Sequence, residues 1–250
     1  MMKMTRRLLL AAVAAAPLMA GAANAEGLIT IIVNDPANPY WFTEGEVARK
    51  TAEELGYTAN VAAHKGDTNT ESTLIDTAIT NKSEAIILDP ANADGSIGAV
   101  KKAVDAGIPV ILVNAEINQE GLAKAQLVSN NAQGAALGAQ AWVEAVGDTG
   151  QYVELFGNPA DNNAQTRSNG YETVLSQYPD LEKVGREVAN WDRTQGYQKT
   201  QSLLQANPDI IGVISGVGGG IIRDVFLGDV PPDGISNPWY VLTVLLAGLV

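Results

Sequence analysis

The fold class can be inferred from the stretch "EAIILDPANADGSIGAVKKAVDAGIPVILVN", Glu84 to Asn114. It opens with an apolar run at 84–89, continues with a helical stripe at 96–107, and returns to an apolar run at 110–114. Short apolar runs joined by one amphipathic helix are typical of parallel strands that are buried on both faces. The stretch therefore predicts a strand–helix–strand unit of a parallel sheet.

The same alternation continues on both sides of this unit. Upstream, "LITIIV" at 28–33 predicts a strand, and Thr43 with Glu46 predicts a capping box that begins the following helix. A second capping box is expected at Thr68 and Glu71. Downstream, the rhythm restarts near residue 127 and continues to a strand at 209–215. We expect an α/β protein of two lobes, residues 26–127 and 128–215, each a parallel sheet flanked by helices.

The N-terminus predicts export. Three basic residues are followed by the apolar run "LLLAAVAAAPLMA" from Leu8 and by "ANA" at Ala23–Ala25. This order is typical of a secretory signal peptide, here residues 1–25 with cleavage after Ala25, and it predicts a periplasmic protein. The alternative is a membrane anchor, but the run is short and Pro17 interrupts it.

Composition argues against several classes of function. After cleavage, 13 of the 16 basic residues would face 28 acidic ones, so the surface would repel nucleic acid. The chain has no cysteine and one histidine, His64, which leaves no set for thiolate chemistry or for a zinc site built on several histidines. We expect neither enzyme activity nor a cofactor or metal, and we expect His64 to be solvated or structural.

Loops that follow the predicted strands share one chemistry. Ligands of open parallel sheets bind beyond the carboxyl ends of the strands. A sugar needs aromatic rings for its C–H faces and fixed polar groups for its hydroxyls. These loops combine aromatic rings with amides, carboxylates and an arginine, and the candidates are Asn38, Tyr40, Trp41, Asp89, Asn114, Glu116, Arg167, Trp191 and Asp192.

Several candidates also have structural interpretations. Tyr40 and Trp41 could cap the sheet, Arg167 could form a surface ion pair, and Asp89 before Pro90 could be a turn residue.

The motifs of these loops resemble one family. "NPYW", "ILDPANAD", "GIPVILVN", "TRSNGY" and "NWDRTQGYQKTQSLLQANPDI" are similar to ribose-type periplasmic binding proteins of bacterial ABC importers, over about residues 27–215. The resemblance implies a monomer whose two lobes close on a sugar or polyol and deliver it to an ABC permease, without chemistry. It implies ligand contacts from Asn38, Tyr40, Trp41, Asp89 and Asn114 in the first lobe and from Arg167 and Trp191 in the second.

The chain departs from this family at two places. The family has an acidic residue followed by arginine where Asn114 and Ala115 stand, so ribose itself is not the expected ligand; Glu116 could supply the carboxylate. After the last matching strand, the family has an asparagine and an acidic residue where Val217 and Gly218 stand. The segment that completes both lobes in the family does not follow, so we expect a truncated second lobe.

Residues 216–250 form an atypical glycine-rich and apolar tail. "GVGGGIIRD" lacks the lysine and hydroxyl of a phosphate loop. The segment resembles a glycine-rich motif of small bacterial inner-membrane proteins related to trimeric intracellular cation channels. We hypothesise a fusion or mis-assembled chain joined near residues 210–217; a divergent native C-terminus is the alternative. Two other functions stay open: a membrane-associated protein dominated by the tail, and the ligand-sensing core of a regulator.

Overall fold

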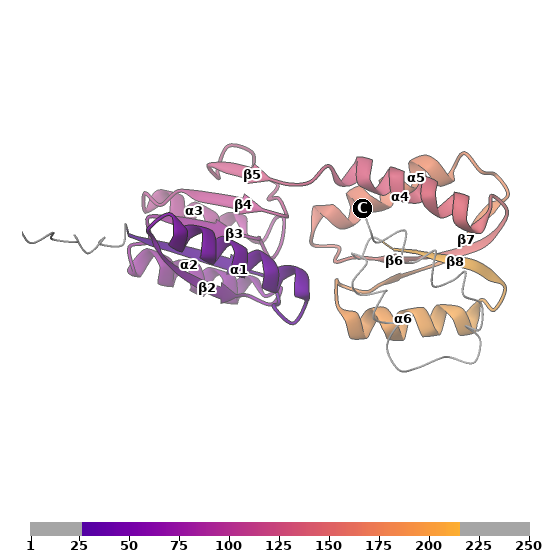
Figure 1. The fold of residues 1–250 in the computed structure, drawn as a ribbon, viewed down its shortest axis with the longest axis horizontal. Coiled ribbons are helices and arrows are strands. Elements are labelled where there is room, and N and C mark those ends of the chain that lie inside the picture. The colour runs from indigo at the N-terminus through magenta and orange to yellow at the C-terminus, as the bar shows by residue number, and fades with distance from the viewer. Residues whose placement is uncertain (1–26, 216–250) are drawn as a thin grey trace, which may run out of the picture.

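Five parallel strands form the first sheet in the order β2-β1-β3-β4-β5 (Figure 1). The computed structural model describes residues 27–215, so the predicted signal peptide and the tail lie outside the described residues. The chain moves from β1 to one side and then to the other, which creates a switch point between β1 and β3. The elements are β1 (Leu28–Val33), α1 (Pro39–Glu54), β2 (Thr58–Ala63), α2 (Thr68–Thr80), β3 (Ala85–Leu88), α3 (Ile97–Asp105), β4 (Val110–Val113) and β5 (Ala125–Leu127).

Three parallel strands form the second sheet in the order β7-β6-β8. In Figure 1 the two sheets lie side by side, and the segment between β5 and α4 passes from one to the other. The prediction of parallel sheets flanked by helices is confirmed. The elements are α4 (Asn131–Val146), β6 (Gly150–Phe156), α5 (Asn162–Leu175), β7 (Leu181–Val188), α6 (Arg193–Ala206) and β8 (Ile210–Ser215).

The apolar runs are continuous because the central strands are covered on both faces. Ile31 and Ile32 are neighbours in β1 and point to opposite faces of the sheet, yet they are 1% and 0% exposed. Ile32 packs in a cluster with residues of α2 and α3, whereas Ile31 packs in a cluster that includes Trp41 of α1. Each face of the first sheet therefore has its own core.

Helix α1 begins earlier than the sequence predicted. The capping box at Thr43 and Glu46 is wrong: the N-cap is Asn38, whose side chain accepts a hydrogen bond from the Tyr40 backbone N–H at 3.0 Å, with Pro39 in the first helical position. Proline suits that position because the missing N–H would have no helical partner. As a result, Tyr40 and Trp41 lie in the first turn of a helix and not in a loop.

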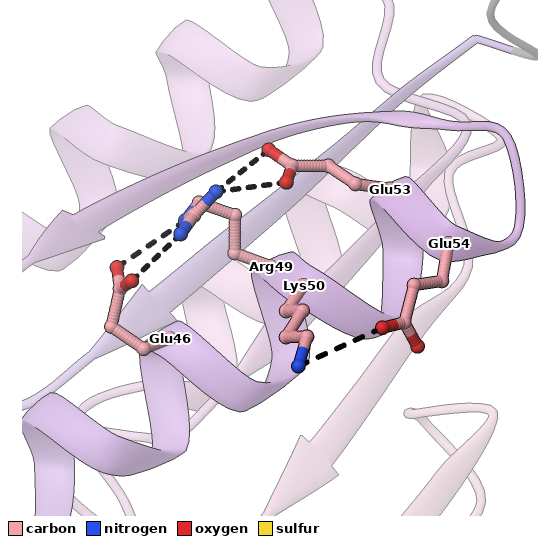
Figure 2. Close-up of polar contacts among 5 residues, drawn as sticks. All are labelled: Glu46, Arg49, Lys50, Glu53 and Glu54. Atoms are coloured by element: carbon pink, nitrogen blue, oxygen red, sulfur yellow. Dashed lines mark hydrogen bonds and ion pairs between the residues drawn. The ribbon is translucent and has the colours of Figure 1, made fainter.

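The outer face of α1 carries a small charge network. Figure 2 shows Arg49 between Glu46 and Glu53, with N–O distances of 2.7 and 2.8 Å, and Lys50 near Glu54. These side chains are substantially exposed, so solvent screens the pairs and they add little to stability.

The second predicted capping box is also wrong. Asp67 caps α2, because its carboxylate accepts from the Thr70 backbone N–H at 2.6 Å. Glu71 is instead fully buried, and its Oε2 accepts from the Ala91 backbone N–H at 2.7 Å. Burial raises the pKa of Glu71. This carboxyl ties the loop after β3 to α2, which holds one edge of the candidate site.

The core of the second lobe is built around Trp142 of α4, which is 0% exposed. Its ring lies on Gly212 of β8, where an added Cβ would come within 2.8 Å of Trp142 Cζ2. The glycine therefore makes room for the indole. Within residues 27–215, no helix combines the length and the apolar character needed to cross a membrane.

We expect Gly212→Ala to lower the free energy of unfolding by about 1–3 kcal/mol, the usual result of overpacking a core. The matched control is Gly134→Ala in α4, where an added Cβ meets nothing within 4 Å. That change should leave stability equal or raise it by up to about 1 kcal/mol, because alanine favours helix. Urea unfolding of both variants measures this, and equal effects would contradict the packing argument.

Candidate functional site

A buried carboxylate lies at the centre of the site. Asp89 follows β3 and is 2% exposed. Its Oδ2 accepts hydrogen bonds from Trp41 Nε1 at 2.6 Å and from Asn114 Nδ2 at 2.9 Å. The structure thus brings together three predicted site residues from α1, from the end of β3 and from the end of β4. Two neutral donors fix the carboxyl in one orientation.

Tyr40 lies above this network. Its side chain is 54% exposed, and its hydroxyl donates to Asn114 Oδ1 at 3.1 Å. Burial of the hydroxyl and the nearby Glu44 and Asp89 raise the pKa of Tyr40 to about 12, so it remains a donor at physiological pH. Asn114 has a positive φ of 62°. Asparagine tolerates this left-handed conformation better than most residues, which explains an amide at the strand end.

In the second lobe, an aromatic residue that follows β7, Trp191, is hydrogen-bonded to a carboxyl group. It is 8% exposed and has a φ of 59°, a conformation that is strained for an aromatic residue and is often found at functional sites. Its Nε1 donates to Asp161 Oδ2 at 3.1 Å. The indole lies on Gly157, where an added Cβ would come within 2.2 Å of Trp191 Cη2. Only glycine at that position leaves the ring in place.

Arg167 of α5 lies beside this indole. Its guanidinium carbon is 5.3 Å from the centre of the Trp191 ring, a cation–π distance. Its Nε donates to Asn131 Oδ1 at 2.8 Å. The predicted pair of Arg167 and Trp191 is therefore one unit, and the first turn of α4 supports it.

Loops of the two lobes touch each other. The Ala93 backbone N–H donates to the Ala160 carbonyl at 2.8 Å, and Asn162 Nδ2 donates to Asn118 Oδ1 at 2.8 Å. Asn163 Nδ2 donates to the Asn114 carbonyl, also at 2.8 Å. Trp41 and Trp191 share one buried apolar cluster. The lobes are thus joined beyond the carboxyl ends of their strands, where the prediction placed the site.

A cavity of about 510 Å³ lies between the start of α1, the end of β4 and the segment that follows β5. Its volume is in the usual range for small-molecule sites. Two predicted residues, Tyr40 and Asn114, line it, whereas Arg167 and Trp191 do not. The remaining lining residues are Glu44 of α1, Val113, Gln126, Leu127, Val128 and Ser129.

Two of the predicted residues have other surroundings. Asn38 uses its side-chain oxygen to cap α1. Glu116 is half-buried, and its charge helps to raise the pKa of Asp161, which burial raises most. A role for Glu116 as the missing carboxylate stays a prediction.

His64 is structural, and the expectation that it could be solvated is wrong. It is 1% exposed, its Nε2 donates to the Asp89 carbonyl at 2.7 Å, and its Nδ1 accepts from the Gly66 backbone N–H at 2.9 Å. Burial lowers its pKa, so the ring is neutral. His64 therefore holds the backbone of the central carboxylate.

Sequence reasoning missed two carboxyls of the site, Glu44 and Asp161. Glu44 lies beside Asp89; burial raises the pKa of Glu44 to about 7, and burial followed by the charge of Glu44 raises that of Asp89. Asp161 caps α5 and accepts from Trp191. A signal for Asp161 was present, because it directly precedes a helix in the loop that follows a strand. A glutamate in the second turn of a charged helix gives no such signal.

Comparison with protein families separates the chain into two parts. Residues 29–225 match the model described as "Periplasmic binding protein domain". Residues 208–250 match the model described as "Glycine transporter". The expectation that the tail resembles a different family is confirmed, and the two matches overlap close to the predicted join.

Curated relatives carry sugar-import names. The chain is 48% identical over 190 residues to the D-apiose import binding protein of Actinobacillus succinogenes, covering 76% of this chain and 61% of the relative. It is 47% identical over 196 residues to the protein of the same name from Paraburkholderia graminis, covering 78% and 63%. The chain thus spans less than two thirds of the length of these relatives.

A solved structure with the same fold is an ABC transporter solute-binding protein of Actinobacillus succinogenes with bound D-allose. The TM-score is 0.72 at 27% identity, with 80% of this chain and 74% of that chain covered. A galactofuranose binding protein has the same TM-score at 21% identity, which shows the fold alone. The domain match covers more than half of the chain, and the resemblance inferred from its loops is confirmed. The chain belongs to the periplasmic binding protein domain family.

Proposed function

We propose that this chain captures a neutral sugar in the periplasm for an ABC importer, and that the sugar is D-apiose or a closely related pentose. The carrying observation is the network in which Trp41 and Asn114 fix the Asp89 carboxylate, next to a cavity that Tyr40 and Asn114 line. Fixed donors and acceptors beside an aromatic ring are what a sugar requires. The 48% identity to a D-apiose import binding protein supports the choice of ligand.

The charges around the cavity favour a neutral ligand over a sugar acid or phosphate. Glu44 lines the cavity, and Asp89 accepts a hydrogen bond from Asn114, which also lines it. The charges of Glu44 and Asp161 both raise the pKa of Asp89, so Asp161 belongs to the same acidic region. Arg167 is a cation of the same region, where it lowers the pKa of Tyr40 and Asp161. Acidic groups outnumber this cation, so an anionic sugar would be repelled.

The proposed mechanism is closure of the two lobes without chemistry. A ligand stabilises the closed arrangement only through contacts that the open arrangement lacks. Hydrogen bonds between the lobes, such as those from Asn162 and Asn163, support such an arrangement. Export by the predicted signal peptide, release to an ABC permease and a monomeric state belong to the same proposal.

Thermal unfolding with a ligand panel tests this function. For the chain beginning at Glu26, we expect D-apiose to raise the melting temperature more than D-ribose or xylitol, and D-galacturonate to have no effect.

Trp41→Phe removes the donor to Asp89 and keeps an aromatic ring, so affinity should fall about ten- to hundredfold. Arg49→Ala, on the exposed face of α1, is the control and should bind normally. A protein that melts cooperatively but responds to no sugar would contradict the proposal.

Gly157→Ala tests the position of Trp191. The added Cβ cannot coexist with the indole at 2.2 Å, so the ring must move and its hydrogen bond to Asp161 must break. We expect a shift in indole fluorescence and at least a tenfold loss of sugar affinity. Gly134→Ala, which meets no atom within 4 Å, should change neither. Unchanged affinity in Gly157→Ala would remove Trp191 from the proposed site.

The match of residues 208–250 to a glycine transporter model favours membrane association as a second candidate function. Incubating the chain that begins at Glu26 with phospholipid vesicles separates the candidates. If the tail dominates, the chain should sediment with the vesicles in the absence of sugar and should stay bound to them at high salt. Full recovery in the supernatant would leave sugar capture as the function.

A further inference from the structure

Two asparagine side chains join the two halves of the candidate site. Asn163 of α5, which is 6% exposed, donates from Nδ2 to the Asn114 carbonyl at 2.8 Å and accepts at Oδ1 from Asn131 Nδ2 at 2.7 Å. Asn131 of α4 accepts at its own Oδ1 from Arg167 Nε at 2.8 Å. Because Arg167 lies beside the Trp191 ring, a line of hydrogen bonds connects this second-lobe pair to the cavity-lining Asn114.

The chemistry of the two ends fixes the orientation of both amides. A guanidinium can only donate and a backbone carbonyl can only accept, so each amide has one orientation that satisfies the whole line. Asn131 must present its oxygen to Arg167, and Asn163 must present its nitrogen to Asn114. Hydrogen bonds that point in the same direction also polarise one another. Both positions therefore require a side chain that accepts and donates at once, which an ionised carboxylate cannot do.

The backbone of Asn163 is fixed by the second lobe as well. Its N–H donates to Asp161 Oδ1 at 2.9 Å, and Asp161 Oδ2 accepts from Trp191 Nε1 at 3.1 Å. A second route thus connects Asn163 to the same tryptophan. The second lobe sets the position of Asn163, while its side chain reaches the first lobe.

At the other end, the two amides hold two walls of the cavity. Asn163 binds the carbonyl of Asn114, a residue with a positive φ of 62°. A non-glycine residue keeps such a conformation only with support from its surroundings. Asn131 Nδ2 also donates to the Ser129 carbonyl at 3.2 Å. Asn114 and Ser129 both line the cavity, although neither Asn131 nor Asn163 does.

We infer that Asn131 and Asn163 form an amide relay through which the second lobe positions Asn114 for the ligand, so that both determine affinity and selectivity from outside the cavity. The inference rests on the proposed function, because it concerns the same site. Neither asparagine is among the site residues predicted from the sequence. Their roles are those of positioning residues, which act through Asn114.

The relay makes the shape of the cavity depend on lobe closure. The Asn114 side chain donates to Asp89 and accepts from the Tyr40 hydroxyl, so its position sets two groups at once. Closure brings Asn163 to the Asn114 carbonyl, and opening removes this support. A ligand beside Asn114 therefore meets the supported wall in the closed arrangement alone, which is the kind of difference through which a ligand stabilises one state.

Two aspartate variants of the chain that begins at Glu26 separate this role from ordinary contact between the lobes. Asn163→Asp can still accept from Asn131 but loses the donor to the Asn114 carbonyl. Asn162→Asp is the matched control. It makes the same change at the neighbouring position of α5 and breaks a bond of the same length, 2.8 Å, to Asn118, a residue outside the cavity lining.

Isothermal titration calorimetry with D-apiose and with D-ribose measures the difference. We expect Asn163→Asp to raise the Kd for D-apiose about tenfold or more and to reduce the preference for D-apiose over D-ribose about threefold or more. Asn162→Asp should raise both Kd values by one common factor of about three or less, which preserves the preference. Equal effects of the two variants would overturn the relay and leave sugar capture intact.

A second break in the relay covers the case in which Asn163→Asp does not melt cooperatively. Asn131→Ala removes the bonds to Arg167 and Asn163 and leaves the Asn163 donor to Asn114 in place. It should also weaken the preference for D-apiose over D-ribose, and an unchanged preference would overturn the relay.

A measurement without ligand separates the relay from the sugar function. Trp41 Nε1 and Asn114 Nδ2 donate to the same Asp89 oxygen, so a movement of Asn114 should shift the Trp41 indole N–H resonance in an NMR spectrum. Trp41→Phe assigns that resonance. We expect Asn163→Asp to shift it and Asn162→Asp, which has the same charge, to leave it in place. An unmoved resonance in Asn163→Asp would overturn the relay, whereas a wild-type chain that binds no sugar would overturn sugar capture and leave the resonance to decide the relay.

Discussion

Burial of one carboxyl at the end of a central strand is the constraint on which the site depends. Asp89 is 2% exposed, and a buried charge is costly unless hydrogen bonds or a proton compensate it. Trp41 and Asn114 provide the hydrogen bonds, and each can do so only from its own position in the fold. Trp41 must lie in the first turn of α1, and Asn114 must adopt a positive φ after β4.

Buried polar side chains also hold the backbone at Asp89 and in the loop that follows it. His64 holds its backbone carbonyl, and Glu71 holds the loop that follows through Ala91. Both side chains are fully or almost fully buried. The local geometry of the site is therefore fixed by polar groups inside the first lobe, on a sheet whose two faces are covered by separate apolar clusters. Preorganisation of this kind reduces the entropy lost when a ligand binds.

Much of the fold could be predicted from the sequence, because a strand covered on both faces must be apolar throughout. The run at 28–33 is β1 with the predicted bounds. The two helix starts were predicted less well. Thr43 and Thr68 can cap a helix, but the N-caps of α1 and α2 are Asn38 and Asp67. Asparagine and aspartate rank above threonine at the N-cap, and proline directly after Asn38 adds to that preference, so capping preference agrees with both observed starts.

Residues of the candidate site could be named from the sequence where residue type and position coincide. Polar residues directly after strands, such as Asp89 and Asn114, can be found because parallel strands end at one edge. Glu44 and Glu71 could not be found as buried carboxyls, because Glu44 lies within a helix of many charged residues and Glu71 fits the pattern of a capping box. The packing of α1 and α2 against the sheet turns these two side chains inward, and this packing cannot be read from the sequence alone.

The contacts between the lobes have a consequence for the response of the protein to its surroundings. Asn162, Asn163 and the Ala93–Ala160 backbone pair join the lobes through amides, which carry no net charge. Dissolved ions screen charge pairs but leave hydrogen bonds between amides nearly unchanged. Hydrogen bonds between amides should therefore hold the lobes together equally well at low and at high ionic strength.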